Sequence, residues 1–306
     1  MSSHKKMTLL DFLELLPYEL HRKMLSVNRT FVLYRTSKTM RMIVENAKLD
    51  TIVVKKSDIK FPNGAGLHDK LNCLNACCKI ILLDLYLCDL RESGGQVIAD
   101  VLRVNTTLTR IYLQHNKLGE GGGQAIADAL CTNSTLLRLD LEWNNIRRVG
   151  GQAIGTALRE NHTLTELDIK HNGIGADGIQ AIADALCTNS TLQSLDLSSN
   201  NAEVVGAHAI ARMLRVNKTL RKLDLSFNKL ESKGVQKIAD ALCVNTTLQK
   251  INLYFNDAVD IEQAIAEVLR VNSTLQSLDL RSNFLGSNQE NEIRKSWGNR
   301  KGTLHI

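Results

Sequence analysis

Leucine and other apolar residues return along this chain with a period of 28 residues. Within each period the pattern Leu-x-x-Leu-x-Leu-x-x-Asn recurs, as at Leu136, Leu139, Leu141 and Asn144. The alternating apolar positions predict a short strand, because successive side chains of a strand point to opposite faces. Each copy opens with Asn-x-Thr-Leu, which begins at Asn105, Asn133, Asn161, Asn189, Asn217, Asn245 and, 27 residues later, Asn272.

A second pattern, Gly-x-x-Ala-Ile-Ala-x-x-Leu, follows each strand and has the spacing of one helix face, as from Gly178 to Leu186. A degenerate first copy begins at Cys77, so we expect eight strand-plus-helix units. Parallel strands stack about 4.8 Å apart, whereas packed helices need about 8 to 10 Å, so the stack must bend. The sequence therefore predicts an α/β horseshoe with parallel strands on its concave side and helices on its convex side.

An asparagine follows each strand and a glycine lies at the start of each helix. We expect the asparagine amides to bind backbone groups of neighbouring turns, since buried backbone groups need partners. We expect the glycines to permit close contact between units. Cys88 takes the asparagine position in the first copy, where it is a weaker partner. The asparagines are Asn116, Asn144, Asn172, Asn200, Asn228, Asn256 and Asn283, and the glycines are Gly94, Gly122, Gly150, Gly178, Gly206 and Gly234.

The end of each helix alternates between arginine and cysteine, in the order Arg103, Cys131, Arg159, Cys187, Arg215, Cys243 and Arg270. The repeat resembles the leucine-rich repeat. Its length and its alternation are similar to the ribonuclease-inhibitor class, which includes the sensor domains of NOD-like receptors and the GTPase-activating protein of Ran. The resemblance covers residues 77–283 and implies a solenoid that recognises another protein.

Atypical segments flank the repeats, as a solenoid requires to cover its terminal core. Ser287-Asn-Gln-Glu290 is interpreted as a capping box for a short helix, and Thr303–Ile306 as a last strand. Leu49–Val54 predicts a strand and Leu67–Ala76 a helix. The expected domains are a helical N-terminal cap at residues 1–48 and a repeat domain at residues 49–306, with an irregular unit 49–76, repeats 77–286 and a C-terminal cap 287–306.

Residues 8–47 lie outside the repeat and predict two helices. The sequence LPYELHRKML followed by VLYRTSKTMRMIV resembles an F-box, the helical module that docks on the adaptor of cullin ubiquitin ligases. The alternative is a helical cap that only covers the first unit. The F-box resemblance implies that the adaptor would contact Leu16, Pro17, Leu20, Leu25 and Leu33.

The net charge of +6 belongs to the N-terminus, where residues 1–60 hold twelve Lys or Arg against six Asp or Glu. Apolar residues interleave with these cations, which favours amphipathic helices over a nucleic-acid site. No apolar run has the length of about 18 residues that a membrane span needs, and we expect no membrane partner and no signal peptide. Seven cysteines, an odd number without close, paired spacing beyond Cys77 and Cys78, indicate free thiols in a reducing compartment, the cytoplasm or the nucleus.

Residues with catalytic or metal-binding chemistry fall in the repeat columns. His115 and His171 occupy equivalent positions two repeats apart, about 10 Å at the spacing of strands, which is too far to share a zinc ion. We therefore expect no enzyme activity, no metal and no cofactor. The in-phase Asn-x-Ser/Thr sequences have the form of glycosylation sites, but they are interpreted as turns in which Asn binds the local backbone. A column of Asp residues is expected to keep the concave face solvated and negative.

The position before each strand-end asparagine carries large rings in several repeats, where other repeats carry Ser199 or Ser282. Exposed rings beside charges have the composition of a binding hot spot. The alternative is that the rings only pack on one another between adjacent strands. The candidate protein-binding residues are Tyr112, His115, Glu142, Trp143, Glu166, Lys170, His171, Phe227, Tyr254 and Phe255.

Two classes of function fit this sequence best. In the first, an F-box-type subunit holds a protein target on the repeats for a cullin ubiquitin ligase. In the second, a stand-alone repeat protein senses or inhibits its partner. GTPase activation, as by the Ran-activating family, is a third alternative, although the acidic tail expected of that family is absent.

Overall fold

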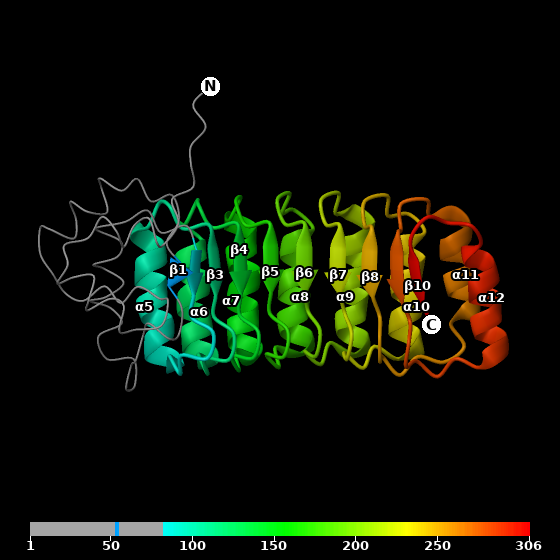
Figure 1. The fold of residues 1–306 in the computed structure, drawn as a ribbon, viewed down its shortest axis with the longest axis horizontal. Helices are drawn as coiled ribbons and strands as arrows, with labels where there is room; N and C mark the ends of the chain where they lie inside the picture. The colour runs from blue at the N-terminus through cyan, green and yellow to red at the C-terminus, as the bar shows by residue number, and fades with distance from the viewer. Residues whose placement is uncertain (1–52, 55–81) are drawn as a thin grey trace, which may run out of the picture.

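The computed structural model describes residues 53–54 and 82–306 of the chain. Within these ranges, short parallel strands alternate with helices and form one sheet whose strand order follows the sequence, β1 to β10 (Figure 1). The strands are β1 Val53–Val54, β2 Leu82–Asp84, β3 Arg110–Tyr112, β4 Arg138–Asp140, β5 Glu166–Asp168, β6 Ser194–Asp196, β7 Lys222–Asp224, β8 Lys250–Asn252, β9 Ser277–Asp279 and β10 Thr303–His305. The helices are α5 Arg91–Val104, α6 Gly119–Leu130, α7 Arg147–Glu160, α8 Gly175–Leu186, α9 Glu203–Val216, α10 Glu231–Leu242, α11 Glu262–Val271 and α12 Ser287–Trp297.

The strands form one side of the molecule and the helices the other. In Figure 1 the row of helices extends beyond the row of strands at both ends. Helices need about twice the spacing of paired strands, so the strands lie on the inner side of the bend. The predicted α/β solenoid of parallel strands and outer helices is therefore confirmed.

The core follows the predicted apolar positions. Central strand residues such as Leu139 and Leu167 pair in register, and both are buried. The helices contribute the opposite wall, as Ile182 and Leu186 do from α8, also fully buried. Each unit buries its apolar face only against its neighbours, so the core is a continuous layer between sheet and helices.

The asparagine at the end of each strand binds two repeats at once, as predicted. The Asn172 amide donates to the carbonyl oxygen of Ile169 at 2.9 Å and to that of Leu141, in the preceding repeat, at 2.8 Å. Its Oδ1 accepts from the backbone N–H groups of Asn144 and Ile146 at 3.0 and 3.2 Å. Asn172 is 2% exposed, so these bonds satisfy groups that water cannot reach.

A second row of asparagines also bonds backbone groups of two repeats, at the turn where each helix leads into the next strand. Asn189 donates to the carbonyl oxygens of Leu158 and Asn161 in the preceding repeat and accepts from the N–H groups of Thr191 and Leu192. Its side chain is buried. The turn interpretation of these Asn-x-Ser/Thr sequences is therefore confirmed: an amide engaged on both sides inside the protein is not an attachment point for a glycan.

Glycine permits backbone contact between adjacent helices, as expected. A Cβ atom on Gly95 would lie 2.5 Å from the Cα of Gly122 in the next helix, closer than carbon atoms approach without overlap. A Cβ on Gly150 would lie 2.1 Å from Cγ2 of Ile146, within its own repeat. Any larger residue at these positions would force the helices apart or distort the turn.

The two-repeat alternation corresponds to two helix lengths. Units with arginine have 14-residue helices in α5, α7 and α9, whereas units with cysteine have 12-residue helices in α6, α8 and α10. In the shorter units the thiol lies at the helix end, and Cys187 donates from Sγ to the carbonyl oxygen of Ala183. The expected free thiols are confirmed for Cys131, Cys187 and Cys243.

The ends agree with the sequence except at the last helix. The predicted strands appear as β1 and β10, which pair with β2 and β9. The capping-box interpretation of Ser287 and Glu290 is wrong by one residue: Gly286 is the N-cap, and its N–H donates to Oε1 of Gln289. The extended backbone of Gly286 starts the helix at Ser287, so Gln289 is the third helical residue, from which a side chain reaches back to the N-cap. The expected helix at Leu67–Ala76 and the N-terminal module 1–48 lie outside the described residues.

Replacing a strand-end asparagine will destabilise the solenoid. Asn172→Ala leaves buried N–H and C=O groups in two repeats without partners, so we expect a loss of about 2–4 kcal/mol in the free energy of unfolding. Urea denaturation of the full chain measures it. Gln152→Ala, at an exposed site on α7, should change the value by less than about 0.5 kcal/mol. Equal effects of the two substitutions would contradict the role of the asparagine.

Candidate protein-binding face

Large rings from consecutive repeats stack along the rim of the strand-lined face. Trp143 lies between His115 and His171, with ring centroids 5.5 and 4.4 Å away and planes within 15° of parallel. Tyr86 closes the row edge-to-face against His115 at 5.6 Å. We call these four residues the first aromatic stack.

A second aromatic stack lies two repeats further along the rim and consists of Phe227, Tyr254 and Phe255. The Phe227 ring lies 5.0 Å from both Tyr254 and Phe255. Arg281 places its guanidinium 5.7 Å from the Tyr254 ring. The rings therefore pack on one another, as the alternative interpretation proposed, yet substantial ring surface stays exposed: 45% of Trp143, 45% of Phe227 and 46% of Phe255.

The backbone under these rings is left-handed. The φ angle is +56° at Trp143, +56° at Phe227 and +52° at Phe255, a conformation that costs a side chain with a Cβ about 1–2 kcal/mol. Ser199 and Ser282 share it, so the repeat geometry imposes it at this position. Glycine or asparagine would adopt it at less cost, and neither occurs in this column. Local stability therefore does not account for the choice of large rings.

Small side chains separate the two stacks. β6 and the turn after it contribute Ser194, Ser198 and Ser199, and the next repeat contributes Ser226. The hydroxyls of Ser198 and Ser226 donate to Asp196 and Asp224 at 2.6 Å. These bonds keep both serine side chains close to the sheet. We call these four residues the serine gap. The rim thus presents two raised aromatic stacks with a low polar gap between them.

Ion pairs cross the strands beside the first stack. Lys170 Nζ lies 3.2 Å from Glu142 Oε2, and Arg138 donates to Glu166 at 2.7 Å. Arg138 also places its guanidinium 5.4 Å from the Tyr112 ring. The ten predicted residues thus lie on one face, but among the described residues Tyr112 joins no ring stack, and Glu166 and Lys170 already have partners. The prediction of a binding site at these residues stays a prediction.

The Asp column, which was expected to keep the concave face solvated and negative, is partly buried. Each of these side chains accepts a hydrogen bond from the backbone N–H two residues later, as Asp140 and Asp168 do from Glu142 and Lys170. Burial raises the pKa of Asp140 to about 6, and burial together with the charges of Asp196 and Asp140 raises the pKa of Asp168 to about 7. The Asp side chains thus bind backbone N–H groups just after each strand. They form a half-buried row in which neighbouring carboxylates repel one another.

Two carboxylates of the Asp column and that of Glu142 approach one another closely enough to hold a hard cation. Oxygens of Asp140, Glu142 and Asp168 all lie within 4.8 Å of one another. Lys170 already pairs with Glu142, and Gln114 donates to Asp140 at 2.6 Å. An ammonium group thus supplies the positive charge that an ion would bring.

Sequence reasoning missed Tyr86 and Arg281 on this face. Tyr86 sits in the degenerate first repeat, two residues after its Asp84, at the position that Glu142 and Lys170 hold in their own repeats. A column-by-column alignment that included this repeat would have identified it. Five predicted adaptor contacts, at Leu16, Pro17, Leu20, Leu25 and Leu33, lie outside the described residues.

Comparison with known proteins supports the repeat assignment. The family model described as "Leucine Rich repeat" matches residues 104–127, 132–155, 160–183, 188–211, 216–239 and 271–288. A search of curated proteins gave no match.

Among solved structures, the leucine-rich repeat-containing protein LegL7 of Legionella pneumophila aligns over 89% of each chain with a TM-score of 0.53 and 17% identity, which shows a shared fold. Actin-binding site 2 of leiomodin-1 covers 48% of this chain and 86% of its own at 24% identity and a TM-score of 0.43. The C-terminal domain of tropomodulin from Caenorhabditis elegans covers 48% of this chain and 90% of its own at 14% identity and a TM-score of 0.43.

None of the helices in the described part of the chain combines the length and the apolar character that crossing a bilayer requires.

The raised pKa of Asp168 makes stability depend on pH. Its folded value, about 7, exceeds the ordinary value of 3.8, so this carboxyl favours the folded state fully below pH 3.8 and loses that contribution as pH rises through 7. Asp168→Asn removes the cost, and its Oδ1 can still accept the Lys170 N–H, as Asn252 does in its own repeat. We expect the variant to gain about 2 kcal/mol over the unsubstituted protein between pH 4 and pH 8.

Chemical denaturation at each pH measures the effect. Asp279→Asn is the control, because Asp279 has Arg281 as an ion-pair partner at 2.6 Å and should not gain stability when neutralised. A pH profile of Asp168→Asn that parallels the unsubstituted protein would refute the assignment.

Proposed function

Because this chain is a leucine-rich-repeat protein, we propose that it is a protein-binding scaffold whose strand-lined face holds a protein partner. The observation that carries the proposal is the pair of exposed aromatic stacks on either side of the serine gap. Large, rigid rings supply contact area at low entropic cost and dominate the energetics of protein interfaces. A smaller polar gap between them gives a partner side chain a place to enter.

The energetics of the stacks favour binding over internal stability. A ring–ring contact contributes about 0.5–1.5 kcal/mol, which is comparable to the cost of a left-handed residue. The stacks therefore bring little net stability to the free protein. Covering the exposed ring surface with a partner would add the apolar burial that is missing. The ion pairs of Arg138 and Lys170 surround the first stack and would form the polar rim.

The proposed interaction predicts a separation of affinity from stability at Trp143. Trp143→Ser introduces the residue that the same column carries at Ser199, so the fold should accept it with little change in melting temperature. Loss of the central ring should weaken the partner by about 2 kcal/mol or more, roughly 30-fold in Kd. The partner is first isolated by co-purification with the full chain, and its affinity is then measured by calorimetry.

Phe284→Ser is the matched control, since Phe284 is 67% exposed but belongs to neither stack. It should leave affinity unchanged. If Trp143→Ser lowers the melting temperature and spares affinity, the stacks are structural and the binding face lies elsewhere.

The finer proposal is that residues 1–48 are an F-box-like module and that the repeats select a target for a cullin ubiquitin ligase. It rests on the sequence at Leu16–Leu20 and on the position of this segment before the repeats. Stand-alone sensing or inhibition is the main alternative. For GTPase activation, the third alternative, we find no supporting contact among the described residues of the strand-lined face.

Deletion of residues 1–48 distinguishes these functions. If the segment docks on the ligase adaptor, the full chain should co-purify with the adaptor and the deleted chain should lose it while keeping its repeat-bound partner. Recovery of the partner with neither protein retaining the adaptor would exclude the ligase role and leave the scaffold role intact.

A further inference from the structure

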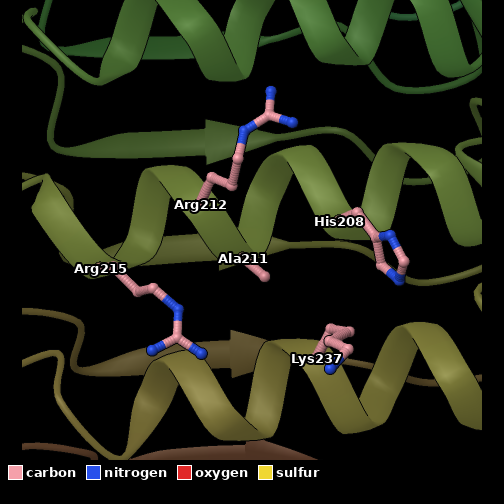
Figure 2. A pocket seen from close by; sticks show the side chains of 5 residues that line it. All are labelled: His208, Ala211, Arg212, Arg215 and Lys237. Atoms are coloured by element: carbon pink, nitrogen blue, oxygen red, sulfur yellow. The ribbon is translucent and has the colours of Figure 1, made fainter.

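A groove between α9 and α10, which we call the basic groove, lies on the helical side, opposite the candidate face. It is lined by His208, Ala211, Arg212 and Arg215 of α9 and by Lys237 of α10. Figure 2 shows Ala211 at its centre, Arg215 reaching toward α10, and His208 and Lys237 at the other end. Three of the α9 side chains recur at four- and three-residue steps, so they share one face of the helix and span about 10 Å along it.

Three of these side chains depart from the residues that other repeats carry in the same columns. His208 replaces a glutamine, Arg212 a carboxylate or threonine, and Lys237 an alanine or valine. The replaced columns are Gln96, Gln124, Gln152, Gln180 and Gln236; Asp100, Asp128, Thr156, Asp184 and Asp240; and Val97, Ala125, Ala153, Ala181 and Ala209. In these three columns, α9 and α10 therefore carry a histidine or a cation where the other repeats carry a neutral or acidic residue.

The fold neutralises only part of this charge. Arg212 pairs with Asp184 of α8 at 2.8 Å, and Lys237 lies 3.7 Å from Asp240. Among the described residues no carboxylate lies within ion-pair distance of Arg215 or His208. The floor is the Ala211 methyl group and the apolar stems of the long side chains, which can pack against a partner while their charged ends stay at the rim.

We propose that this groove between α9 and α10 binds an acidic segment of a protein partner. Three cations, Arg212, Arg215 and Lys237, together with the His208 ring match a run of Asp or Glu side chains along an extended peptide better than they match one small anion. A single-stranded nucleic acid fits less well, because the lining holds no Phe, Tyr or Trp ring on which a base could stack. This site goes beyond the strand-lined face and does not depend on it.

The repeat itself supplies the test variant. His208→Gln, Arg212→Asp and Lys237→Ala restore the residues found in neighbouring units, so the triple variant should fold with an unchanged circular-dichroism melting curve. A fluorescein-labelled hexaglutamate peptide is titrated with the full chain at low ionic strength, and anisotropy gives Kd. We expect the triple variant to bind at least about tenfold more weakly, and added salt to weaken the unsubstituted protein.

The control is Arg148→Asp with Lys301→Ala, which removes the same formal charge and also breaks one surface ion pair, Arg148 with Asp177. It should retain the affinity of the unsubstituted protein, as should Trp143→Ser. Equal weakening in the triple variant and the charge-matched control would show general electrostatics and overturn the proposal. Unchanged binding by the triple variant, or tighter binding of oligothymidine than of hexaglutamate, would overturn it as well. None of these outcomes bears on binding at the aromatic stacks.

Discussion

The architecture depends on one interaction: the side-chain amide of a buried asparagine closes backbone hydrogen bonds of two repeats. One such row lies at the strand ends and a second where helices lead into strands. An amide has two donors and an acceptor with two lone pairs, and these asparagines use both kinds of group. The spacing can change by a residue, as it does between Asn256 and Asn283, while the bonds of both asparagine rows are kept. Hydrogen-bond geometry therefore fixes these two rows, and apolar burial follows them.

Because the repeats share one bonding and packing scheme, only some positions of the repeat can change their residue from one copy to the next. Core positions keep an apolar residue, which ranges from Ala129 to Met213 within one column, and a Cβ added at Gly95 or Gly150 would overlap a neighbouring atom. Exposed columns have no such constraint, so a change there carries information. The rings before the strand-end asparagines and the cations of α9 and α10 are both departures of this kind. Each repeat column thus provides its own internal reference.

Periodicity made most of the fold predictable. The strands, helices, asparagine bonds and free thiols follow from spacing alone, because each depends on position along the repeat. The burial of the Asp column and the position of the last helix cap were not predicted, because both depend on where a side chain reaches. A carboxylate can face solvent or accept the N–H two residues later, and the residue type alone does not determine which of the two occurs. Ring stacking between His115, Trp143 and His171 was an open alternative for the same reason.

The serine gap and the basic groove belong to the same two repeats, those of β6–α9 and β7–α10. Within each unit a short strand and one helix share a rigid core, so neither surface can move without the other. Yet the side chains of the two surfaces point to opposite sides of that core and share no contact, and exchanges of surface residues at such separation add independently. One repeat can therefore carry two partners whose affinities are set by different residues. That independence is what allows restoration of repeat residues on one side to leave recognition on the other side intact.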